Sequence, residues 1–80
     1  MTSINIRGAL PSDRAALNRL AELDSAPAIL GPALVAEVGG RIVAALGLRS
    51  GTRIADPFVP TADLLALLEL HARSREVLAA

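Results

Sequence analysis

The chain has 80 residues, 52% of them hydrophobic, and a formal net charge of zero from eight arginines and eight acidic residues. The arginines are spread along the chain and only one residue is aromatic, which argues against a nucleic-acid partner. Cysteine is absent, no apolar run approaches the ~20 residues that span a bilayer, and no signal-peptide pattern opens the sequence, so we expect a cytoplasmic protein with no membrane partner.

The first part of the chain predicts a strand, a helix and a loop. Alternating apolar residues indicate a strand over Ser3–Arg7 with one buried face. Ser12 is expected to cap the helix that follows, whose apolar stripe runs from Ala16 to Leu23. The segment 25–32 contains two prolines and a glycine, and is expected to be a loop.

The middle of the chain predicts three antiparallel strands. Two apolar runs, Ala33–Val38 and Arg41–Leu48, flank two glycines, which suit the positive φ angles of a tight hairpin turn. Both runs are apolar at nearly every position, as in strands covered on both faces or filled by alanine on one of them. A turn at 50–51 then leads to a short strand over Arg53–Asp56.

The last part of the chain predicts a helix that begins after Thr61. Helical spacing gives it one apolar face, formed by Leu64, Leu67, Leu68 and His71. The apolar residues Ala66, Leu70 and Val77 lie outside this face, so the helix is expected to be covered by the sheet on one side and by another chain on the other. The fold class is therefore predicted as α+β, a small antiparallel sheet with two helices in the order β-α-β-β-β-α.

Two segments resemble the GNAT family of acyl-CoA-dependent N-acetyltransferases. INIRGALPSDRAALNRLAELD is similar to the opening strand and first helix of the family, and LVAEVGGRIVAALGL resembles its second and third strands. The resemblance covers residues 3–56 and implies a GNAT-like half fold. The chain departs from the family where SAPAILGP replaces a second helix, and where DPFVPTAD replaces the glycine-rich turn that binds the pyrophosphate of CoA.

The turn DPFVPTAD argues against a bound acyl-CoA. Proline has no N–H to donate, and Asp56 and Asp63 would repel a phosphate. We therefore assign no catalytic, cofactor-binding or metal-binding residue, expect no cofactor, and find that the residues argue against an enzyme.

Few other residues invite a chemical role. His71, the only histidine, could act as a general base, but its place on the apolar helix face favours a packed or interface role. Asp56, Thr61 and Asp63 could together bind a hard cation, yet their spacing fits no calcium loop, and Asp56 is more simply a turn residue. Phe58 is expected to pack in the core, with an exposed interface anchor as the alternative.

We expect one domain over residues 1–80. A domain of this size is too small to bury the side chains of so many hydrophobic residues, although alanines account for part of the high hydrophobic content. We therefore expect a non-catalytic domain that forms a homodimer or docks on a larger protein. The candidate interface residues are Leu70, Val77 and Ala66 of the last helix, Arg53 and Ile54 of a short edge strand, and Phe58. The alternative is a minimal acyl-CoA-binding protein or acetyltransferase whose cleft forms between subunits.

Overall fold

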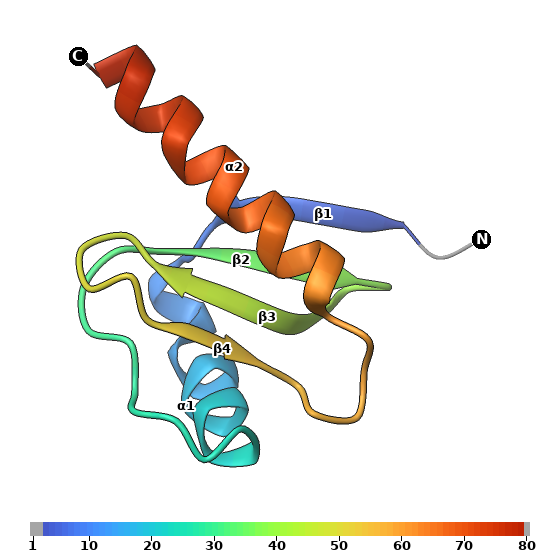
Figure 1. The fold of residues 1–80 in the computed structure, drawn as a ribbon. Coiled ribbons are helices and arrows are strands. Elements are labelled where there is room, and N and C mark those ends of the chain that lie inside the picture. The colour runs from blue at the N-terminus through green and yellow to red at the C-terminus, as the bar shows by residue number, and fades with distance from the viewer. Residues whose placement is uncertain (1–2, 80) are drawn as a thin grey trace.

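The structure, a computed structural model, describes residues 3–79, and side chains as far as residue 75. Its four strands are β1 (Ile4–Gly8), β2 (Ala33–Val38), β3 (Arg41–Gly47) and β4 (Arg53–Ala55). Its helices are the short 3-10 turn η1 (Pro11–Asp13), α1 (Arg14–Leu23) and α2 (Ala62–Ala79). The α+β class and the order β-α-β-β-β-α are as the sequence predicts, with strand bounds that differ by about one residue (Figure 1).

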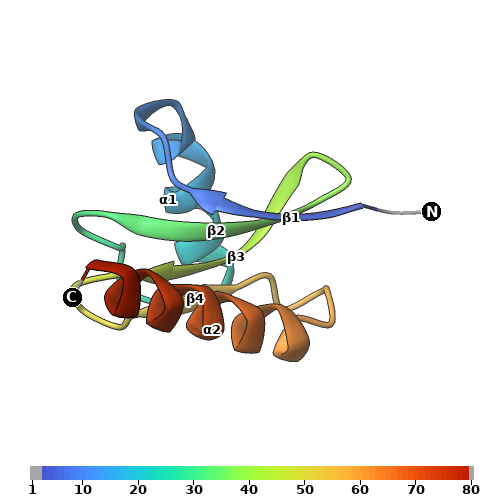
Figure 2. The same cartoon turned by 90° about the horizontal axis from the view of Figure 1, so that it is seen from above.

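The strands form one antiparallel sheet in the order β1-β2-β3-β4, so β1 and β4 are its two edges. The helices lie on opposite faces, with α1 on one side and α2 on the other (Figure 2). The α1 side buries Leu20, Ala21, Val35, Ala45 and Ile54. The α2 side buries Leu34, Ala36, Val43, Ala44, Leu46, Leu64 and Leu68. Coverage on both faces explains why the two central strands are apolar at nearly every position.

The hairpin between β2 and β3 forms as predicted. Gly39 and Gly40 have φ angles of 61° and 82°, which residues with a side chain rarely adopt. Along the same pair of strands the register shifts between Ala36 and Glu37, which leaves Val43 as an extra residue on β3. This bulge places Val43 in the α2-side core together with its neighbour Ala44.

Two details of the helices differ from the prediction. Ser12 does not cap α1, because it lies inside η1, where the carboxylate of Asp13 instead accepts the N–H of Leu10 at 2.7 Å. In α2 the face toward the sheet contains Leu64, Leu65, Leu68 and Ala72, whereas Leu67 and His71 are exposed. The packed role predicted for His71 is therefore wrong, while its alternative interface role stays a prediction. A helix that is apolar on most sides does not reveal from its spacing which side meets the sheet.

Candidate functional site

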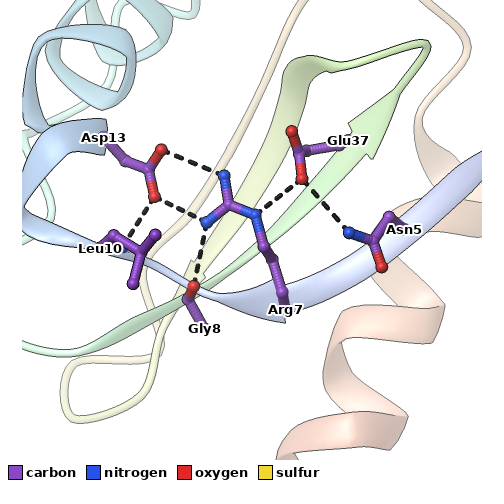
Figure 3. Close-up of polar contacts among 6 residues, drawn as sticks. All are labelled: Asn5, Arg7, Gly8, Leu10, Asp13 and Glu37. Carbon is purple, nitrogen blue, oxygen red and sulfur yellow. Dashed lines mark hydrogen bonds and ion pairs between the residues drawn. The ribbon is translucent and has the colours of Figure 1, made fainter.

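The most connected polar group in the structure is the guanidinium of Arg7 (Figure 3). Its Nη1 and Nη2 donate to the two carboxylate oxygens of Asp13 at 2.7 and 3.1 Å, and its Nε donates to Glu37 at 2.7 Å. Nη1 also donates to the carbonyl of Gly8, and the amide of Asn5 donates to Glu37 at 3.3 Å. These contacts tie β1 to β2 and to the start of α1.

The same contacts explain the electrostatics of the network. Hydrogen bonds from Arg7, and to a smaller extent from the N–H of Leu10, together lower the pKa of Asp13 to about 2. Hydrogen bonding to Arg7 also lowers the pKa of Glu37, and the two carboxylates raise the pKa of Arg7. Our sequence reasoning missed this network. The available signal was an arginine ending the strand and an aspartate in the next turn, two elements that a bidentate pair can join.

A cavity of about 390 Å³ lies beside this network, between α1 and the sheet. Leu20, Leu23 and Ile42 form its apolar wall, and the charged lining consists of three arginines and three acidic residues. Arg7 and Arg41 are paired with these acids, while Arg19 has no ion-pair partner among the described residues. Within the described chain, no buried side-chain nitrogen or oxygen lacks a hydrogen bond. The polar groups of the cavity are thus largely occupied by one another, which indicates a structural role.

The turn after β4 is organised by hydrogen bonds to Asp56. Its side chain is 2% exposed, accepts the N–H of Phe58 at 2.8 Å, and pairs with the guanidinium of Arg41 at 3.1 Å. Its carbonyl accepts the N–H of Val59 at 3.2 Å. Asp56 is therefore a turn residue, as predicted, and two N–H groups of the turn are already bonded within it. Among the described residues, no three histidine, aspartate or glutamate side chains gather as a metal site.

Phe58 is the clearest correction among the candidate residues. It was expected to pack in the core, but its side chain is 84% exposed. The N–H of Phe58 is bonded to Asp56, and prolines at 57 and 60 restrict the turn, in which Val59 and not Phe58 packs against the α2-side core. The alternative role of Phe58 as an exposed interface anchor stays a prediction.

The candidate residues on α2 lie where a second chain could reach them. Leu70 is 57% exposed and Ala66 is also exposed, while the side chain of Val77 lies outside the described residues. Leu67, which the prediction placed on the buried face, is 37% exposed and adds to this surface. We refer to Ala66, Leu67 and Leu70 as the outer face of α2. The last turns of α2 extend past the β1 side of the sheet (Figure 1).

The candidate residues on β4 do not form an open surface. Ile54 is 1% exposed and belongs to the α1-side core, so its side chain has no surface for a partner. Arg53 is exposed and pairs with Glu69 of α2 at 2.6 Å. The N–H of Ala55 faces outward and donates to the carboxylate of Asp24 at 3.1 Å. The structure therefore separates the candidate residues, since it exposes the outer face of α2 and covers much of β4.

The chain matches no protein-family model, no curated protein and no solved structure. The GNAT-like half fold and the acyl-CoA-binding alternative therefore stay predictions from the sequence. None of the helices in residues 3–79 is long and apolar enough to cross a membrane.

Proposed function

We propose that the chain is a non-catalytic protein-interaction domain that associates with itself through the outer face of α2. The observation that carries the proposal is Leu70, a leucine 57% exposed on a helix that already buries Leu64 and Leu68 against its own sheet. Burying a leucine side chain contributes about 1.5–3 kcal/mol, so contact with a second chain would stabilise this surface.

The length of α2 supports the same proposal. The helix runs from Ala62 to Ala79, yet Ala72 is its last described residue that packs on the core. Short helical segments without tertiary contacts are marginal in water. A second chain against this end of α2 would add tertiary contacts to the helix.

The proposal is tested by the mass of the chain in solution. We expect the wild type to be a dimer and Leu70→Glu to raise the dissociation constant by about tenfold or more, which corresponds to about 1.4 kcal/mol. Light scattering after size exclusion, over a range of concentrations, measures this shift. Far-UV circular dichroism should show that the helices remain.

Leu30→Glu is the matched control. Leu30 is 76% exposed and lies in the loop after α1, so the same change of side chain occurs away from α2. We expect this variant to keep the wild-type mass. A wild type that is monomeric at every concentration would contradict the proposal, as would equal effects of the two substitutions.

A further inference from the structure

The two edges of the sheet differ in what they present to another chain. At the β4 edge, the outward N–H of Ala55 is bonded to Asp24. At the β1 edge, the five residues from Ile4 to Gly8 pair with β2 on one side, and no other strand within residues 3–79 lies against their other side. We infer that β1 pairs antiparallel with β1 of a second copy, an inference that rests on the proposed self-association.

The hydrogen bonds at the ends of β1 show which of its groups face outward. Gly39 donates to the carbonyl of Ser3 at 3.1 Å, and Ala9 donates to Ala33 at 2.8 Å. In an antiparallel pair the bonded residues alternate, so the odd-numbered residues of β1 bond to β2. The backbone groups of Ile4, Ile6 and Gly8 consequently point away from the sheet.

This edge is complementary to a second copy of itself. A two-fold axis at Ile6 places Ile6 opposite Ile6 of the second copy, and Ile4 opposite Gly8 of the second copy. Each such pair exchanges two backbone hydrogen bonds. The carbonyl of Gly8 already accepts a bond from Arg7, but a carbonyl oxygen can accept two.

The side chains also fit this register. On the α1 face, Asn5 lies opposite Arg7 of the second copy, so no like charges face one another across the axis. On the α2 face, the isoleucines of the two copies come together. Ile4, now 56% exposed, would be covered there.

The position of α2 points to the same edge. The helix packs on β2 and β3, and its last turns pass beyond β1 (Figure 1). In the two-fold arrangement, each α2 would reach toward the α2 face of the other copy. The open strand edge would then be buried by the second copy, and the two sheets would become one continuous sheet with both α2 helices on the same face.

Proline substitutions at the two edges test the inference. Ile4 and Arg53 are each the first residue of an edge strand, and each has its N–H facing outward by the alternation of the ladder. Proline removes that N–H without breaking a bond to the neighbouring strand. We expect Ile4→Pro to raise the dissociation constant at least tenfold, and Arg53→Pro to leave it unchanged.

The outcomes separate this inference from the proposed function. A monomeric wild type would overturn both. A dimer that Leu70→Glu weakens and Ile4→Pro does not would overturn the β1 pairing alone, and a dimer sensitive only to Arg53→Pro would overturn it in favour of the β4 edge.

Amide hydrogen exchange tests the pairing without any substitution. The N–H of Ile6 should exchange with water more slowly at high protein concentration than at low concentration, because the second copy would accept its hydrogen bond. The N–H of Ala9, which is bonded to Ala33 within the chain, is the internal reference. A rate for Ile6 that does not change while the dimer forms would overturn the inference.

Discussion

The two edge strands, β1 and β4, each have a row of backbone groups with no neighbouring strand within residues 3–79, and they differ in how far other parts of the chain shield it. β4 has three residues, and its edge is shielded by side chains from elsewhere in the chain: Asp24 accepts the N–H of Ala55, and Arg53 is held by Glu69. β1 has five residues, and its Arg7 bonds to Glu37 on β2 and to Asp13 in η1. The comparison teaches that an edge strand is shielded by side chains from neighbouring segments of the chain, and that its own sequence does not decide whether it is shielded.

The largest loss of stability is expected from replacing Asp56, which anchors the turn after β4. Asp56→Ala removes the buried acceptor of the Phe58 N–H and the partner of Arg41. Hydrogen bonds to a charged group contribute about 1.5–3 kcal/mol, so we expect a loss of about 2–3 kcal/mol and a melting temperature lower by roughly 10–20 °C. Thermal unfolding followed by circular dichroism measures the change.

Asp56→Asn is the control for this prediction. It keeps an oxygen that can accept the N–H of Phe58 and removes the charge that attracts Arg41. It should be less destabilising than Asp56→Ala. Wild-type stability in the alanine variant would show that the turn does not depend on this carboxylate.

A smaller effect on stability, but a change in association, is expected from opening the β4 edge. Asp24→Ala leaves the N–H of Ala55 without its acceptor, at a position open to water, so we expect a loss below about 1 kcal/mol. The uncovered edge should add species larger than a dimer, detectable by light scattering. Asp24→Asn, which keeps an acceptor oxygen, should not. An unchanged mass distribution in Asp24→Ala would show that Asp24 does not protect the edge.

The smallest effect on stability is expected from Asp13, which bonds to Arg7 of β1, and only at acidic pH. The pKa of Asp13 falls to about 2 from its usual 3.8, because Arg7 hydrogen-bonds the charged form. Folding therefore gains stability from this group above about pH 4 and loses it as the pH falls toward 2. The lowered pKa of Glu37 acts in the same direction.

Melting temperatures measured across this acid range test the prediction. The wild type should lose stability as the acid range is entered, and Asp13→Asn should lose less over the same interval. Parallel curves for the two proteins would show that the Arg7 network does not set the acid response.

The sequence was most informative where local chemistry decides the outcome. Two adjacent glycines predicted the hairpin at 39–40, and the prolines and glycine after α1 predicted the loop. It was least informative about which surfaces meet. Phe58 is aromatic yet exposed, and Ile54 was expected at an interface but is buried in the core. Ile54 is buried because it packs in the core beneath α1, a long-range contact that apolar spacing does not reveal. Phe58 stays exposed in a turn whose N–H bond to Asp56 its aromatic side chain does not indicate.

The sequence alone determined the α+β class and the order of the elements, because these follow from turn residues and hydrophobic periodicity, and it left coverage of the central strands on both faces as one of two alternatives. The tertiary structure alone decided which side of α2 meets the sheet, how Arg7 gathers Asp13 and Glu37, and which edge strand is shielded. The physical reason is that these features depend on groups brought together by folding, where a single hydrogen bond from the N–H of Ala55 to Asp24 can close one edge while the other stays open.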